Sequence, residues 1–66
     1  MQVTVNGEDT QLAADATVAD LVAARSGAHD RVAVALNGDV VPRSSWPATH
    51  LSPGDTLEVL APTAGG

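Results

Sequence analysis

The chain has one segment with a helical pattern, and that segment is too short to be stable alone. Val18, Leu21 and Val22 recur at the i, i+3, i+4 spacing of a single helix face. Thr17 before them and Asp20 three positions further on form a capping-box pattern, which predicts a helix beginning at Val18. A helix of two to three turns is marginal in water, so it must pack against something larger. The chain is therefore predicted to place one helix on one face of a sheet.

The predicted helix, 18–26, lies between segments with the alternating pattern of strands. Alternation of apolar and polar residues predicts strands over 1–5, 10–13, 31–36, 40–41 and 56–60. Turn-forming residues separate these strands at 6–9, 37–39 and 52–55, and residues 43–50 are expected to be irregular. The strand over 31–36 is apolar on both faces, which predicts that it lies in the interior of the sheet or that its second face is covered.

The resulting element order, β-β-α-β-β-β, restricts the fold. The right-handed crossover rule favours the first and last strands lying side by side and parallel in the centre of the sheet. This arrangement is an α+β fold, the β-grasp (ubiquitin-like) roll, a mixed sheet with one main helix on one face. A ferredoxin-like fold would need a second helix of similar quality, which the sequence lacks. We expect residues 1–60 to form this domain and residues 61–66 to be a flexible C-terminal tail.

Composition and motifs argue against several functional classes. The 66 residues include no cysteine, which rules out a thiolate metal site and a catalytic thiol. His29 and His50 lie in no metal-binding motif, so no metal is expected. Three arginines, no lysine and a net charge of −5 argue against nucleic acid as a partner. No phosphate-binding loop or catalytic constellation is present, so we expect a protein that is not an enzyme and binds no cofactor itself.

The apolar segments are short. The longest apolar run, Val32–Leu36, is far below the roughly 20 residues that a membrane-spanning helix needs. Met1–Val5 carries neither a basic region nor a signal-peptide core. We therefore expect a cytoplasmic protein with no membrane partner.

The sequence ends in Gly65-Gly66, a feature that a simple folded domain does not need. One interpretation is a frayed end, because glycine-rich termini are common. The other is functional: residues 61–66 reach roughly 20 Å when extended, and glycines, which lack a Cβ, can enter a narrow channel. The reactive group would be the Gly66 α-carboxylate, a poor electrophile because it is an anion at neutral pH. Its activation, for example by adenylation with ATP, would require an enzyme acting in trans.

Three further residues are candidate partner contacts. Arg43 and Trp46 are residue types typical of interface anchors, although Trp46 could instead cover the end of the core and Arg43 could pair with a carboxylate. Leu60 is expected to point away from the helix, where it would form an apolar patch with Ala33 and Ala35 on the open face of the sheet. The alternative for that face is a mildly apolar, solvated surface.

Taken together, these features resemble the ThiS family, the sulfur carriers of thiamine biosynthesis. The resemblance covers the whole chain and rests on the predicted fold order, Val41-Pro42-Arg43 followed by Trp46, the strand start Gly54-Asp55-Thr56-Leu57-Glu58-Val59, and Gly65-Gly66. The small subunit of molybdopterin synthase shares the fold and the tail. It is usually longer and does not typically carry the Val-Pro-Arg-x-x-Trp stretch, so the resemblance favours ThiS.

The resemblance implies a cycle in which the chain is a cosubstrate. A ThiF-type adenylyltransferase would use ATP to convert the Gly66 carboxylate to an acyl-adenylate. A persulfide, derived from cysteine by a desulfurase, would then yield a thiocarboxylate, whose sulfur a ThiG-type thiazole synthase accepts. Gly65 and Ala64 would give the tail access to the partners' active sites. Sulfur delivery to another pathway, a non-covalent interaction module and ubiquitin-like protein modification are the alternatives.

Overall fold

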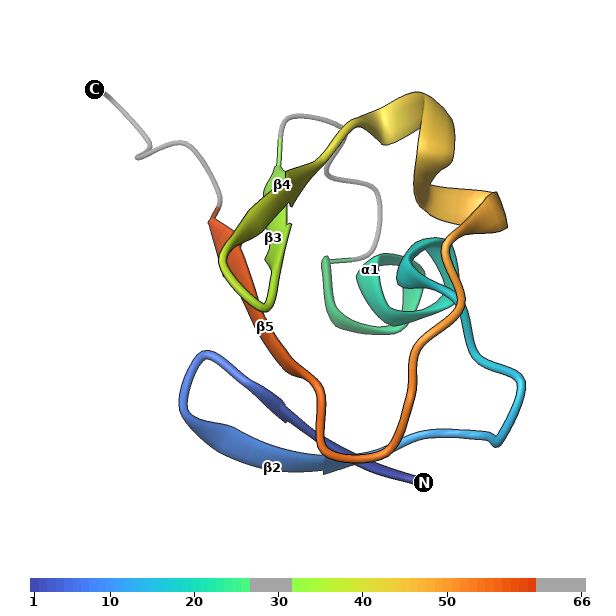
Figure 1. Ribbon diagram of the computed structural model, residues 1–66, viewed down its shortest axis with the longest axis vertical. Coiled ribbons are helices and arrows are strands. Elements are labelled where there is room, and N and C mark those ends of the chain that lie inside the picture. The colour runs from blue at the N-terminus through green and yellow to red at the C-terminus, as the bar shows by residue number, and fades with distance from the viewer. Residues whose placement is uncertain (27–31, 61–66) are drawn as a thin grey trace.

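A mixed sheet curves around one helix in the computed structural model, which describes residues 1–26 and 32–60 (Figure 1). The strands are β1 (Gln2–Val5), β2 (Glu8–Gln11), β3 (Ala33–Leu36), β4 (Asp39–Val41) and β5 (Thr56–Leu60). The helices are α1 (Val18–Ser26) and the 3₁₀ helix η1 (Arg43–Ala48). The strand order is β2-β1-β5-β3-β4, in which β1 and β5 are parallel and the other neighbours antiparallel. This topology confirms the predicted β-grasp roll, including the adjacent first and last strands.

Helix α1 begins with the predicted capping box. The Asp20 backbone N–H donates to Thr17 Oγ1 at 3.2 Å, and the Thr17 backbone N–H donates to Asp20 Oδ2 at 3.0 Å. These two bonds satisfy donors that a helix start otherwise leaves unpaired. Val18, Leu21 and Val22 are buried, so the face predicted from their spacing is the one that packs on the sheet.

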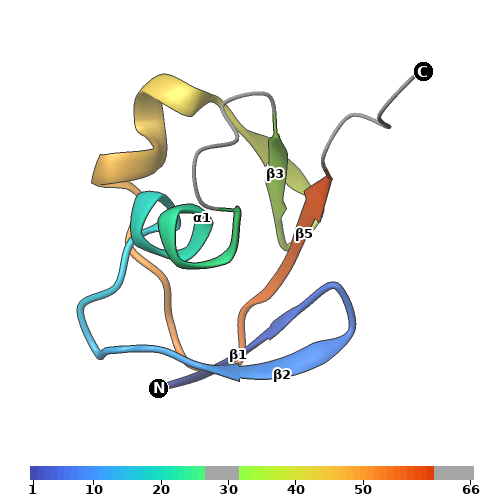
Figure 2. The same cartoon turned by 180° about the vertical axis from the view of Figure 1, so that it is seen from behind.

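The core lies between α1 and the inner face of the sheet, and η1 closes one end of it (Figures 1 and 2). Its members are aliphatic apart from one tryptophan: Val3, Val5, Val18, Leu21, Val22, Val32, Val34, Trp46, Leu51, Leu57 and Val59. Because alternate residues of β1, β3 and β5 contribute to it, the opposite face of the sheet carries the remaining side chains.

The second strand differs from the prediction. A strand was expected over 10–13, but β2 begins at Glu8, because the turn before it uses two residues rather than four. Asn6 and Gly7 have φ angles of 51° and 83°, the positive values that a tight two-residue hairpin turn requires. Glu8 is therefore already paired with Val5.

Residues 43–50 were expected to be irregular, but most of them form η1. Pro42 precedes this helix with φ −59°, a value that its ring favours. Trp46 is a residue of η1, and its indole is buried in the core, where the Nε1–H donates to the Val41 carbonyl at 2.9 Å. The buried ring thus anchors a segment that has no helical periodicity of its own, and hydrogen bonds from Ser45 N–H to the Pro42 carbonyl and from Thr49 Oγ1 to the Ser45 carbonyl also hold it. Strand β3 begins at Ala33, whereas the expected strand began at position 31, which lies outside the described residues.

Candidate functional site

Strand β5 leads from the centre of the sheet toward the predicted carrier tail. It pairs with β1 on one flank and with β3 on the other. Leu57 and Val59 point into the core, where they are 0% and 8% exposed. The tail residues Ala64, Gly65 and Gly66 lie outside the described residues. The candidate site is therefore defined by the end of β5, at Leu60, and by the surface around it.

Leu60 lies in an apolar patch on the open face of the sheet, as its position in the strand predicted. Its side chain is 63% exposed, and it pairs directly with Ala33 of β3. Ala35 continues the row on β3, and its partner on β4 is Val40, which is 75% exposed. We call Leu60, Ala33, Ala35 and Val40 the open-face patch.

Val40 is the member that the sequence analysis did not include. Alternation along β4 could have identified it, because Val41 is partly buried against the core and Val40 must then face outward. The signal was weak since a strand of three residues shows little periodicity.

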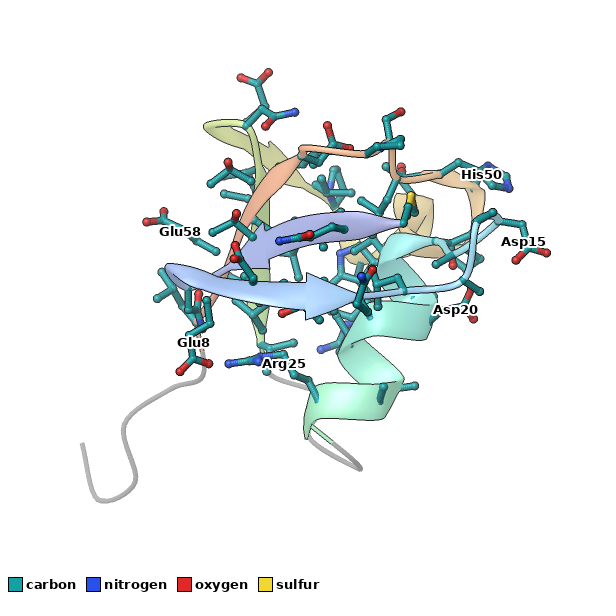
Figure 3. All side chains as sticks on the ribbon, turned by 90° about the horizontal axis from the view of Figure 1, so that it is seen from below. Glu8, Asp15, Asp20, Arg25, His50 and Glu58 are labelled. Carbon is teal, nitrogen blue, oxygen red and sulfur yellow. The ribbon has the colours of Figure 1, made fainter. Side chains whose placement is uncertain are left out.

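The open face has an apolar half and a polar half. Glu58 is exposed beside the open-face patch, pairs with Ala35, and extends away from α1 (Figure 3). Over β1 and β2 the same face carries Gln2 and Gln11, which pair with each other. Glu58 therefore places an acidic group at the edge of the open-face patch, whereas the two glutamines lie farther away on the same face. An apolar patch with a polar rim is typical of surfaces that bind other proteins.

Trp46 and Arg43 are adjacent to each other but differ in exposure. The Trp46 side chain is 8% exposed and packs in the core, as the structural interpretation predicted. Arg43 is exposed, and its guanidinium carbon lies 5.3 Å from the centroid of the Trp46 ring, a cation–π distance. Within residues 1–26 and 32–60, the contact that the structure gives Arg43 is with the Trp46 indole, and no ion pair with a carboxylate is found there. A role of Arg43 or Trp46 in partner binding stays a prediction.

The described residues contain no group of three or more His, Cys, Asp or Glu side chains that could hold a metal ion. His50 is exposed at the loop that leads to β5 (Figure 3), and His29 lies outside the described residues. Within 1–26 and 32–60, neither helix has the length and apolarity needed to cross a membrane.

Comparison with known proteins gives whole-chain matches. The model of the ThiS family matches residues 3–66. The crystal structure of the thiamine biosynthesis protein ThiS from Geobacter metallireducens is 35% identical, covers 100% of both chains and superposes with a TM-score of 0.83. An NMR solution structure of a thiamine biosynthesis protein from the same organism is 36% identical over 100% of this chain and 88% of its own, also with a TM-score of 0.83.

A curated relative extends this likeness to a larger protein. The chain is 35% identical over its full length to a protein called thiazole synthase from Paramagnetospirillum magneticum. The chain spans about a fifth of the length of that relative. A unit resembling this chain is thus part of a much longer polypeptide there.

Proposed function

The chain belongs to the ThiS family, and from this we propose that it is a sulfur carrier in thiamine biosynthesis that supplies the sulfur of the thiazole ring. The observation that carries the proposal is the family match over residues 3–66, which includes Gly65-Gly66. The full-length likeness to a ThiS structure supports it. The chain is then a cosubstrate that partner enzymes load and unload, and it is not a catalyst.

The proposed chemistry takes place at the Gly66 carboxylate. The carboxylate attacks the α-phosphorus of ATP on a ThiF-type adenylyltransferase and displaces pyrophosphate, which leaves an acyl-adenylate. A persulfide sulfur derived from cysteine then displaces AMP, and a thiol cleaves the S–S bond to leave the thiocarboxylate. The adenylate is needed because a free carboxylate is a poor electrophile. Ala64 and Gly65 precede the reacting carbon and would enter the partner's active site, where small residues permit close approach.

We propose a thiazole synthase of the ThiG type as the acceptor of the sulfur. A polypeptide called thiazole synthase contains a unit that is 35% identical to this whole chain. Two units joined in one polypeptide are held at high effective concentration, which is useful when one acts on the other. We propose that this chain makes the corresponding encounter with its acceptor.

We propose that the open-face patch docks the partners. It lies at the end of β5, beside the point where the tail begins, so docking there would direct residues 61–66 to an active site nearby. Six residues reach roughly 20 Å, enough to enter a channel from a docked body. Glu58 next to the patch favours a partner surface with a basic group, through electrostatic complementarity.

Substitution Leu60→Asp is expected to weaken loading by the adenylyltransferase. Burying a leucine side chain contributes about 1.5–3 kcal/mol, so its loss should lower kcat/KM at least about tenfold. Gln2→Asp is the matched control, because it adds the same charge to the same face but over β1. Rates of AMP release at varied carrier concentration would measure both variants. Equal rates for Leu60→Asp and Gln2→Asp would contradict docking at the patch.

Intact mass spectrometry tests the function directly. The chain is incubated with a ThiF-type enzyme, ATP, a cysteine desulfurase, cysteine and a thiol reductant, and its mass is measured. We expect a gain equal to the replacement of one oxygen by sulfur, because the thiocarboxylate differs from the carboxylate only there. Addition of a ThiG-type synthase with its other substrates should return the original mass. An unchanged mass in the first step would contradict the proposal, and sulfur release only to a molybdopterin-forming partner would assign another pathway.

A further inference from the structure

Two Asn-Gly turns, one in each hairpin, have the same backbone geometry. Asn6 and Asn37 both have φ 51°, and Gly7 and Gly38 follow with φ 83° and 91°. Asparagine tolerates this left-handed conformation better than most residues, which accounts for its use in such turns. In both turns, however, the asparagine side chain also bonds to β5, which lies beside each hairpin.

Asn6 bonds near the C-terminal end of β5. Its Oδ1 accepts a hydrogen bond from the Val59 backbone N–H at 2.9 Å, and its Nδ2 donates to the Val59 carbonyl at 3.1 Å. One rung earlier, the Asn6 backbone N–H donates to the Leu57 carbonyl at 2.9 Å. The hydrogen-bond ladder between β1 and β5 thus extends to Val59, one step beyond the point at which the β1 backbone enters its turn. The side-chain amide there takes the place of a peptide group.

Asn37 does the equivalent at the other end of β5. Its Oδ1 accepts from the Thr56 backbone N–H at 3.0 Å, and its Nδ2 donates to Asp55 Oδ1 at 3.1 Å. The two asparagines therefore have the same φ and the same type of turn, and both bond to the backbone of the same strand. They differ in which end of β5 they hold, and only Asn6 lies near the residues that lead to the tail.

We propose that Asn6 is a positioning residue for the sulfur-carrying end of the chain. Its side chain bonds to Val59 on the side of β5 that faces β1, just beyond the last paired residues of these two strands. Leu60 remains paired with Ala33 on the opposite flank. Without the Asn6 side chain, the end of β5 would be held only by its pairing with β3. The direction in which the chain continues toward Gly66 would then be less restricted. This inference rests on the proposed sulfur-carrier function.

The test compares Asn6→Gly with its matched control, Asn37→Gly. Glycine adopts positive φ without strain, so each substitution removes the side-chain amide and leaves the turn conformation accessible. Asn6→Asp is a third variant, because it keeps an acceptor for the Val59 N–H but has no donor for the Val59 carbonyl. Thermal unfolding followed by the fluorescence of Trp46, the one tryptophan in the sequence, verifies that each variant is folded at the assay temperature.

Two measurements are then made on each variant. Amide hydrogen exchange should show loss of protection at Val59 in Asn6→Gly and at Thr56 in Asn37→Gly, with protection at Val59 retained in Asn6→Asp. In loading by a ThiF-type enzyme, kcat for Asn6→Gly should fall about fivefold, the factor for ordering roughly one more backbone residue before reaction. KM should stay within about twofold of the native value, because β3 still holds Leu60 in the open-face patch. Asn37→Gly should keep the native kcat, and Asn6→Asp should be intermediate.

The outcomes separate this inference from the function on which it rests. Loading of the native chain with equal kcat for Asn6→Gly and Asn37→Gly would overturn the positioning role and leave the sulfur-carrier function standing. A fall in kcat that follows thermal stability equally in both glycine variants would overturn it too, because the effect would then be structural. If Asn6→Gly does not fold, native kcat in Asn6→Asp overturns the role and a reduced kcat supports it. Failure of the native chain to be loaded would overturn the function and the inference together.

Discussion

Deletion of Gly66 is expected to reduce thiocarboxylate formation at least about 100-fold while the domain stays folded. The deletion moves the terminal carboxylate back by one residue, up to about 3.5 Å, and a misplacement of 1 Å at a reacting group can already cost that factor. The core cluster consists of residues between Val3 and Val59, so its packing does not depend on position 66. Initial rates by intact mass spectrometry and Trp46 fluorescence melts would measure the two effects.

Gly66→Ala is the companion variant for this deletion. It keeps the carboxylate at position 66 and adds one methyl group, so we expect a smaller loss than the deletion produces. The size of that loss reports how narrow the partner's channel is, because glycine alone lacks a Cβ. Loading of the Gly66 deletion at the native rate would contradict the assignment of Gly66 as the residue that must carry the reactive carboxylate.

Substitution Leu57→Ala should leave the domain barely stable. Leu57 is 0% exposed at the centre of the core, and truncation of such a leucine typically costs about 2–5 kcal/mol. A domain of 66 residues has a total free energy of unfolding of about 3–10 kcal/mol, so the loss is comparable to the whole. Urea unfolding followed by Trp46 fluorescence would measure the change in the free energy of unfolding.

Leu60→Ala is the matched control in the same strand. The residue type and the change are identical, but Leu60 is 63% exposed on the open face. We therefore expect a change within about 0.5 kcal/mol, which is usual for surface positions. Similar losses for Leu57→Ala and Leu60→Ala would contradict the register of β5, in which alternate residues face opposite sides of the sheet.

The elements with a strong local pattern were predicted correctly from the sequence. Strand β5 over Thr56–Leu60 and helix α1 from Val18 agree with the expected bounds, and the capping box of Thr17 and Asp20 is formed. Their signals lie within a few residues, since side-chain periodicity and capping depend on near neighbours. The start of β2 was wrong because residues 6–9 all favour turns, and pairing with β1 decided how many of them the turn uses.

Some features of the candidate site were likewise predictable from the sequence, and others were not. Gly65-Gly66 and the outward position of Leu60 could be identified from residue type and alternation. The burial of Trp46 was one of two interpretations that the sequence left open, and packing decided between them. Val40 was missed because a strand of three residues shows little alternation. The helix η1 could not be predicted, because it depends on packing between separate elements.

The sequence by itself determined where most elements form, which of their faces are apolar, and that the chain ends in two glycines. The tertiary structure alone decided that the Asn6 side chain holds the end of β5. Asn6 and Val59 are 53 positions apart, and no local pattern relates a turn asparagine to a strand so distant. Only when the sheet places β1 beside β5 does the Asn6 side-chain amide meet the Val59 backbone N–H and carbonyl, to which it bonds just beyond the β1–β5 pairing.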